Sequence, residues 1–447
     1  MLKSVWAELV KQVINRRWGG SWTILGQLAY FAGVAAGVKL LTSLLGPWTF
    51  GIMALGLTVA GIGNLIFYGP FAQAALRFYA ISLKDGHLVE YFSAIARYQS
   101  VSTFSILTLA VCLSGGVLLV AGDERAGILF FSLLFMVASG IIAVHMAVHN
   151  AAGNHAVVAS TQAVEAWSRV GLALTGILLV GPSATVALAG YALASACVAV
   201  FLWLWGRRKL EGFGQVLEKR PIALETSTRQ MVAYAIPFMA FAVFGAITSC
   251  GDRWIIKLCC GLADVGVYAA LYQVAYAPLV ILSNAISQVF LPLIYVHAGD
   301  GSESVKMQGA RIAHGKVLFA SGLCLSGWVV VTYVFGEPLL RLITTPEFAR
   351  SHDLLWVLAS GGAIFYFGQF LSIEGLYKLQ PQRYMFPKAL HAVTFVLVAW
   401  WLTAKGTGTD GIAIASIIGS VISVGAILYV NFSNGRERVQ APSPAVS

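Results

Sequence analysis

Charged side chains within long apolar stretches are the residues of this chain best placed to do chemistry. Arg169 lies about ten residues into the apolar run 159–181, roughly 15 Å from its start and near the middle of a bilayer. Glu165 precedes it by four residues, which is the order that favours an ion pair within one helix. Ionisable groups at this depth usually face a cavity or a charged partner. We predict that Arg169 binds an anionic group, with the Glu165 pair as the structural alternative.

Lys39, Asp252 and Arg253 lie near the ends of two other apolar runs. Position 39 corresponds to position 254 under the internal repeat described below, so these charges should lie at similar depth on the external side. We expect Lys39 and Arg253 to bind anions there and Asp252 to act in gating or coupling. Two alternatives stay open: Lys39 extends to the membrane surface, or Asp252 pairs with Lys39 to close an external gate.

Glu374 and the histidines are weaker candidates. Glu374 has Lys378 four residues later and lies about a turn from the end of its run, so a surface ion pair is favoured over ion coupling. His145 and His149 form an HxxxH pattern, but no carboxylate or cysteine nearby completes a metal site. We predict no metal and no cofactor. Catalytic patterns such as GxSxG, the P-loop and HExxH are also absent, so we predict that the protein is not an enzyme.

The elements that must position these residues are membrane helices. Of the 447 residues, 58% are hydrophobic and only 11% are charged, whereas soluble domains carry about 25% charged residues. Apolar runs of about 20 residues cross a bilayer as helices, because lipid offers the backbone no hydrogen-bond partners. The sequence predicts an all-α polytopic membrane protein with about twelve transmembrane helices, near 20–43, 51–74, 100–121, 126–147, 159–181, 184–206, 235–258, 266–293, 315–336, 354–377, 386–404 and 410–431.

The distribution of basic residues predicts the orientation of these helices. If both termini are cytoplasmic, the cytoplasmic segments hold 21 of the 29 Lys and Arg residues and the external segments hold five. Such an excess is typical of the cytoplasmic side. The net charge of +10 is then explained by topology and by contact with anionic membrane lipids. We therefore expect no nucleic-acid partner.

The longest polar segment divides the helices into two equal sets. It predicts an N-terminal six-helix lobe at 1–206, a basic cytoplasmic linker at 207–230 and a C-terminal six-helix lobe at 231–447 with a short cytoplasmic tail. Gly46 and Gly51 recur as Gly261 and Gly266, 215 residues later. Such glycines permit a tight external turn and close helix approach. Repeated halves of this kind are typical of secondary transporters, which rock about a central site.

Several stretches resemble a known family in the same order along the chain. They read LLGPWTFGIMALG and FAQAALRF around the second helix, QAVEAWSRVGLAL on the fifth, CGDRWIIKLCCGLADVGVYAALYQVA at 250–275, and FGEPLLRLITTPEFARSHDLLWVLASG at 335–361. The sequence is similar to the polysaccharide flippases, which translocate O-antigen and exopolysaccharide precursors. These belong to the multidrug/oligosaccharidyl-lipid/polysaccharide (MOP) exporter superfamily, whose fold is of the multidrug-and-toxin-extrusion (MATE) type.

This resemblance implies a function and a set of residues. Family members move undecaprenyl-diphosphate-linked sugars from the cytoplasmic to the external leaflet of the bacterial inner membrane, through a cavity between two lobes. Arg77, Arg169, Asp252 and Arg253 fall on positions that match the family pattern. The implied partners are a lipid-linked oligosaccharide, membrane lipids, and polysaccharide polymerase and export proteins. The runner-up is a multidrug antiporter of the same superfamily, and a polytopic polymerase or ligase comes third.

Overall fold

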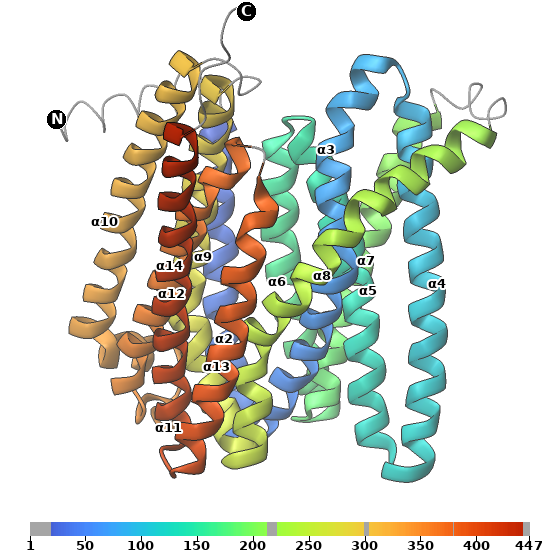
Figure 1. Ribbon diagram of the computed structural model, residues 1–447. Helices are drawn as coiled ribbons and strands as arrows, with labels where there is room; N and C mark the ends of the chain where they lie inside the picture. The colour runs from blue at the N-terminus through green and yellow to red at the C-terminus, as the bar shows by residue number, and fades with distance from the viewer. Residues whose placement is uncertain (1–18, 212–220, 299–303, 379, 441–447) are drawn as a thin grey trace, which may run out of the picture. The chain divides into compact units, whose positions relative to one another are not determined.

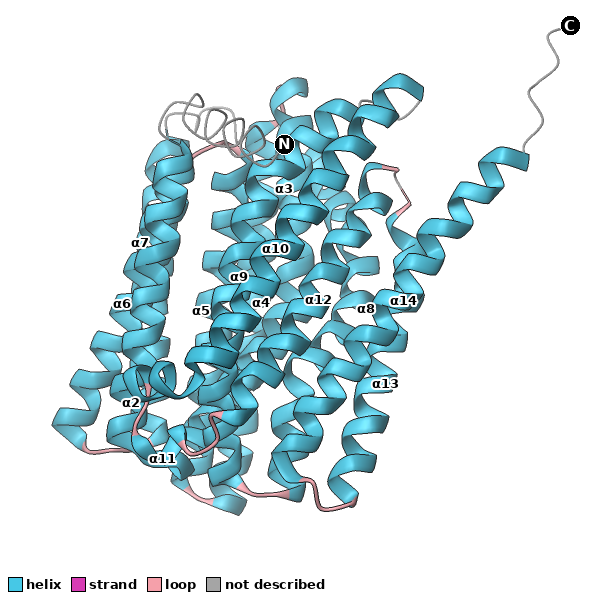
Figure 2. Cartoon of the chain, turned by 90° about the vertical axis from the view of Figure 1, so that its left-hand side faces the viewer, coloured by secondary structure: helices cyan, strands magenta, loops and turns pink. Residues whose placement is uncertain are grey.

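The computed structural model describes residues 19–211, 221–298, 304–378 and 380–440. Within these ranges the chain forms helices joined by short turns, with no strand (Figure 1). Figure 2 shows how little of the described chain lies outside helices. In chain order the elements are α2 (Gly19–Gly63), η1 (Asn64–Tyr68), α3 (Gly69–Asp85), α4 (Leu88–Ala121), α5 (Asp123–Ala151), α6 (His155–Val180), α7 (Ala184–Glu211), α8 (Pro221–Cys259), α9 (Leu262–Ala298), α10 (Ser304–Ile343), α11 (Pro346–Ala349), α12 (Asp353–Tyr377), η3 (Pro381–Tyr384), α13 (Met385–Ala404) and α14 (Gly408–Gln440).

The predicted fold class is confirmed. Ten described helical segments are long and apolar enough to cross a membrane, and a bent pair within α8 makes an eleventh. One of the ten, Leu25–Leu83, has 59 residues, about three times what a bilayer requires. It is interrupted at Gly46, whose backbone is not helical, so it accounts for two predicted crossings. With this division the segments correspond to the twelve ranges expected from the sequence.

The two repeated turns have the backbone that only glycine adopts readily. Gly46 has φ +66° and breaks α2, and Gly261 has φ +128° between α8 and α9. Left-handed or extended positive-φ conformations are strained for residues with a Cβ. The structure thus explains why glycine stands at both of these positions, which are 215 residues apart.

Two other irregularities shape the helices. Within α8, the segments Thr228–Ile236 and Phe241–Cys259 meet at 57°, and the break contains Pro237, which lacks the N–H needed by the helical ladder. The five-residue π-helix η1 joins α2 to α3, and the N–H of Gly69 donates to the carbonyl of Asn64. Such wide turns loosen a helix locally.

Several helices are longer than predicted. The sequence places starts near 100 and 315, but α4 begins at Leu88 and α10 at Ser304. Hydropathy detects only the part of a helix that lies in hydrocarbon, whereas these helices continue into polar sequence. The centre of the predicted basic linker, 212–220, lies outside the described residues. The predicted division into lobes at 206 and 231 therefore stays a prediction.

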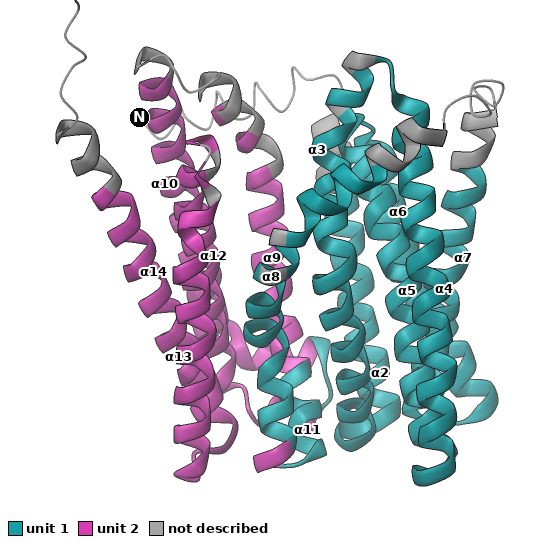
Figure 3. Ribbon diagram, turned by 45° about the vertical axis from the view of Figure 1, so that its right-hand side comes forward, with its two compact units in different colours: residues 1–257, 261–269, 343–345 teal, residues 258–260, 270–342, 346–447 magenta. Residues whose placement is uncertain are grey.

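By internal packing, the chain forms two compact units. Unit 1 contains 1–257, 261–269 and 343–345, and unit 2 contains 258–260, 270–342 and 346–447 (Figure 3). In unit 1, α6 packs on α2 and α7, and α5 packs on α3, α4 and α7. In unit 2, α14 packs on α12 and α13. Each unit thus has its own interior in which polar groups can be held.

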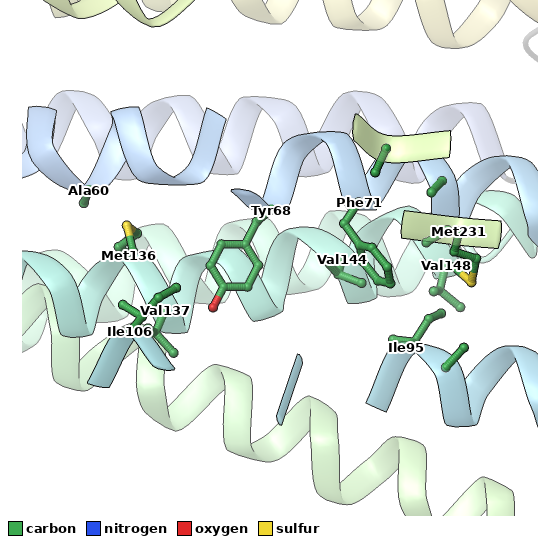
Figure 4. Close-up of a cluster of buried hydrophobic side chains, with 14 of the residues drawn as sticks. Ala60, Tyr68, Phe71, Ile95, Ile106, Met136, Val137, Val144, Val148 and Met231 are labelled. Carbon is green, nitrogen blue, oxygen red and sulfur yellow. The ribbon is translucent and has the colours of Figure 1, made fainter. Parts of the chain in front are cut away.

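The largest described core lies in unit 1 and gathers side chains from five elements. Tyr68 of η1, Phe71 of α3, Ile95 of α4, Val144 of α5 and Met231 of α8 are at most 5% exposed. Figure 4 shows Tyr68 lying along α5 beside this group. Because the core is close-packed, it fixes the positions of α5 and its neighbours. That rigid frame also holds the polar groups described next.

Candidate functional site

Arg169 of α6 is held by two polar partners within unit 1. Its Nη2 donates to Oε1 of Glu165, and its Nε donates to Oγ of Ser195 on α7 at 3.0 Å. The Ser195 hydroxyl in turn donates to the same carboxylate oxygen at 3.1 Å. The side chains of Arg169 and Glu165 are 19% and 11% exposed, and Ser195 is fully buried. The intrahelical pair considered in the sequence is therefore present.

Aromatic groups line the other sides of this guanidinium. Its central carbon lies 4.7 Å from the ring centroid of Phe135 on α5, a distance at which a cation is attracted to the ring face. Tyr191 of α7 packs edge-on against Phe135. The charge of Arg169 also acts on the hydroxyls of Tyr30 and Tyr191. The group therefore lies in a polar niche built by α2, α5, α6 and α7.

One edge of the guanidinium is left over. Arginine has five N–H donors, and the described residues engage those on Nε and Nη2 but not those on Nη1. A donor in this position suits an anionic oxygen, because charge-assisted hydrogen bonds are the strong ones. One turn earlier on α6, Gln162 accepts a hydrogen bond from Gln27 of α2 at 3.0 Å. This second contact fixes α6 against α2.

Asp252 and Arg253 of α8 pair with each other. The Asp252 carboxylate, in a residue that is 2% exposed, accepts a hydrogen bond from the backbone N–H of Arg253 at 2.7 Å. The Arg253 Nη1 lies 3.8 Å from the same oxygen and donates to the Ser249 carbonyl at 3.3 Å. Tyr268 of α9 also hydrogen-bonds this carboxylate. The contacts fix both charges near the external end of α8.

Lys39 and Arg77 do not share this site. Lys39 is half-buried, and its Nζ donates to the carbonyl of Thr344, just beyond the end of α10. A cation at that place satisfies a helix-terminal carbonyl and complements the helix dipole. Arg77 is exposed on α3. The proposed pairing of Lys39 with Asp252 is therefore replaced by separate partners, while the anion-binding role of each cation stays a prediction.

Glu374 forms the expected pair with Lys378, but the pair is not at the surface. The two side chains are 17% and 6% exposed, since α10 and α12 pack around them. His314 of α10 is buried beside them, and its Nε2 is 2.8 Å from the Phe370 carbonyl. A carbonyl can only accept, so Nε2 is the donor. This cluster in unit 2 was not predicted beyond the pair itself.

The HxxxH histidines have separate partners. Nδ1 of His145 lies 3.0 Å from the Ile141 carbonyl and 3.3 Å from Nε2 of Gln99. The ring of His149 packs against Trp205 of α7 at 5.2 Å. Across the described ranges, no three His, Cys, Asp or Glu side chains gather closely enough to hold a metal ion. The two imidazoles are used in helix packing.

Sequence reasoning missed the supporting residues of the Arg169 niche. Ser195, Tyr30 and Tyr191 come from α7 and α2, and nothing in their sequence spacing links them to Arg169. Gln27 and Gln162 carried a usable signal, because an amide in an apolar run needs a partner. Their pairing across 135 residues could be recognised only after α2 and α6 were packed together.

Comparisons with known proteins agree with this architecture. A family model described as polysaccharide biosynthesis protein matches residues 18–295. The fold is similar to that of the lipid II flippase MurJ in an inward closed conformation, with 12% identity and a TM-score of 0.67 over 92% of this chain and 87% of that one. It is also similar to an inward-facing multidrug resistance MATE family transporter of the MOP superfamily, with 13% identity and a TM-score of 0.61 over 94% and 96%. The MATE transporter VcmN of Vibrio cholerae gives 16% and 0.61 over 97% and 98%. No curated protein sequence matches at a significant level.

Proposed function

This chain belongs to the polysaccharide biosynthesis protein family, and from that premise we propose that it is a flippase for a lipid-linked oligosaccharide of the undecaprenyl-diphosphate type. It is a multi-pass membrane protein with the fold of MOP superfamily transporters. The proposed location is the bacterial cytoplasmic membrane, with both termini in the cytoplasm. Transport needs no bond to be made or broken, which fits a chain without a catalytic pattern.

The observation that carries this proposal is the state of Arg169. A diphosphate is too highly charged to cross hydrocarbon unaided, and a buried guanidinium is a strong ligand for phosphate oxygens. Arg169 is fixed on two sides, is mostly buried at membrane depth, and keeps Nη1 for a further acceptor. The lipid tail of such a cargo would stay in the bilayer while the head group crosses.

The acidic residues support an anionic cargo over a cationic drug. A drug antiporter would use carboxylates in the membrane to bind cations. The three carboxylates singled out by the sequence are instead each paired with a basic side chain: Glu165 with Arg169, Asp252 with Arg253, and Glu374 with Lys378. We therefore place the multidrug antiporter second, and the polymerase or ligase third.

Alternating access completes the proposal. Two six-helix halves that rock about a central path would expose the head group first to the cytoplasm and then to the outside. Arg169 and Arg253 would contact the head group, and Arg77 and Lys39 would contact it near the two surfaces. Asp252, Glu165 and Glu374 are proposed for gating or coupling. Polymerase and export proteins are the proposed partners that receive the product.

The test is translocation by the full chain in proteoliposomes. The cargo is a fluorescent undecaprenyl-diphosphate oligosaccharide, and transport is read from its protection against a membrane-impermeant quencher. Arg169→Ala and Arg253→Ala should slow transport about tenfold or more, because a hydrogen bond to a charged group contributes about 1.5–3 kcal/mol. The matched control is Arg341→Ala, since Arg341 also pairs with a glutamate four residues earlier but is 70% exposed.

Unchanged transport in both variants would refute the cationic site. The runner-up is tested in the same liposomes with a cationic dye. If the wild-type protein moved the dye but not the lipid-linked oligosaccharide, the drug-antiporter assignment would replace the flippase.

A further inference from the structure

The carboxylate of Glu165 already occupies one edge of the proposed phosphate ligand. Its Oε1 accepts hydrogen bonds from both Arg169 Nη2 and the Ser195 hydroxyl. An anion that approached Arg169 would therefore meet a negative charge fixed beside its binding partner. For a group meant only to capture phosphate, this arrangement weakens the interaction, so the pair calls for an explanation.

A carrier has to release its cargo as well as bind it. A solitary guanidinium in a mostly buried site would hold a phosphate tightly, because few waters compete and the local dielectric is low. Sites through which ions pass must bind well enough to admit the ion and weakly enough to let it go. A fixed carboxylate next to the guanidinium lowers the affinity without removing the ligand.

We propose that Glu165 is a built-in competitor of the anionic head group, which sets the affinity of Arg169 low enough for the cargo to be released. The inference rests on the proposed function, since it assumes a phosphate-bearing cargo. Nη2 stays with Glu165 while Nη1 takes a phosphate oxygen, so the cargo is held by one edge of the guanidinium rather than by two. A single-edge contact is more easily broken.

Ser195 is the positioning residue of this arrangement. Its fully buried hydroxyl accepts from Arg169 Nε at 3.0 Å and donates to Glu165 Oε1 at 3.1 Å. It therefore holds the carboxylate on Nη2 and leaves Nη1 turned to the remaining side. Removing the hydroxyl should loosen the guanidinium and weaken phosphate binding, which is opposite in sign to removing the charge of Glu165.

The experiment measures affinity and rate separately. Affinity is measured by calorimetry on the full chain in nanodiscs, with geranyl diphosphate and inorganic diphosphate as probes. Rate is measured with the fluorescent lipid-linked oligosaccharide in proteoliposomes. Glu165→Gln keeps the shape of the side chain and its acceptor oxygen, so it should bind the probes about tenfold more tightly, equivalent to about 1.4 kcal/mol, while transport becomes several-fold slower. Ser195→Ala should bind them several-fold more weakly.

The opposite changes in affinity and rate distinguish this role from a structural one. Damage to the fold would weaken binding and slow transport together. Glu337→Gln is the matched control, because Glu337 pairs with Arg341 at the same spacing but is 46% exposed, and it should alter neither quantity. Glu165→Asp keeps the charge but shortens its reach, and should give an intermediate affinity.

Three results would overturn the proposal. Equal or weaker probe binding by folded Glu165→Gln would show that the carboxylate does not compete with phosphate. Loss of folded protein in both Glu165 variants would assign the residue to packing. If the wild-type chain bound neither probe, the phosphate cargo itself, and with it the proposed function, would fail; wild-type binding with no gain in Glu165→Gln would overturn this inference alone.

Discussion

Gly51 of α2 and Gly266 of α9 lie against each other with no room for a side chain on either. A methyl group on Gly51 would lie 2.9 Å from the Gly266 nitrogen and collide with the Leu262 carbonyl. One on Gly266 would lie 3.0 Å from the Gly51 nitrogen and collide with the Pro47 carbonyl. Since 47 corresponds to 262 and 51 to 266 under the same offset of 215, the contacts are reciprocal. The repeated glycines therefore pack on each other as a local twofold axis requires.

Alanine at either glycine should force α2 and α9 apart. The obstructing atoms belong to the backbone and cannot turn aside, so we expect Gly51→Ala and Gly266→Ala each to cost about 1–3 kcal/mol of stability, as overpacked interiors do. The measurement is the midpoint of thermal unfolding in detergent, together with the transport rate. Both should fall, and the double variant should cost less than the sum of the two, because one separation accommodates both methyl groups.

The control for these variants lies on the same helix. A methyl group on Gly61 would meet only the Cys250 sulfur, at 3.8 Å, which is ordinary contact. Gly61→Ala should therefore leave stability unchanged or raise it slightly, because alanine is favoured over glycine in a helix. If Gly51→Ala melted no lower than Gly61→Ala, the close helix approach would be wrong.

Much of this fold follows from local sequence. Apolar length determines the number of crossings, and the spacing of Glu165 and Arg169 predicts their pair, because residues four apart share a helix face. The turns at Gly46 and Gly261 were also predicted, since their spacing recurs. These inferences succeed because membrane helices must satisfy their own backbones within a single segment.

The rest depends on contacts between distant segments. Ser195 meets Arg169 only because α7 packs on α6, and Lys39 meets the Thr344 carbonyl across 305 residues. The π-helix has the wholly ordinary sequence NLIFY, apart from its asparagine, so no local pattern announces it. Burial of the Glu374 pair was missed for the same reason, because only packing of α10 against α12 removes it from solvent.

The Glu374–Lys378 pair in unit 2 should contribute to stability because it is buried. Glu374→Gln leaves the ammonium group of Lys378, which is 6% exposed, without its counter-charge. Breaking a buried pair in this way costs about 3 kcal/mol, and we expect the thermal midpoint to fall accordingly. Glu374→Gln combined with Lys378→Met should recover much of the loss, because no uncompensated charge then remains.

The exposed pair of α10 supplies the comparison. Glu337 and Arg341 have the same spacing but are 46% and 70% exposed, and solvent-exposed pairs contribute less than about 1 kcal/mol. Glu337→Gln should therefore melt close to the wild-type protein. Equal losses for Glu337→Gln and Glu374→Gln would mean that burial does not strengthen the Glu374 pair.

The π-helix η1 should be a feature that transport requires and that folding does not. Its extra residue widens one turn between α2 and α3, and neighbours stabilise the widened turn: Asn64 Nδ2 donates to Ser139 Oγ at 2.8 Å, and the Tyr98 hydroxyl donates to the Phe67 carbonyl at 2.8 Å. Deleting the exposed Leu65 should restore a regular α-helix without shifting the residues beyond it. We expect the deletion variant to fold with an equal or higher thermal midpoint but to transport several-fold more slowly, because a continuous ladder of hydrogen bonds bends less readily than a π-turn. Deleting Leu109 from the regular helix α4 is the control, since it rotates every later side chain by about 100° and should prevent folding; wild-type transport without Leu65 would show that the widened turn serves packing alone.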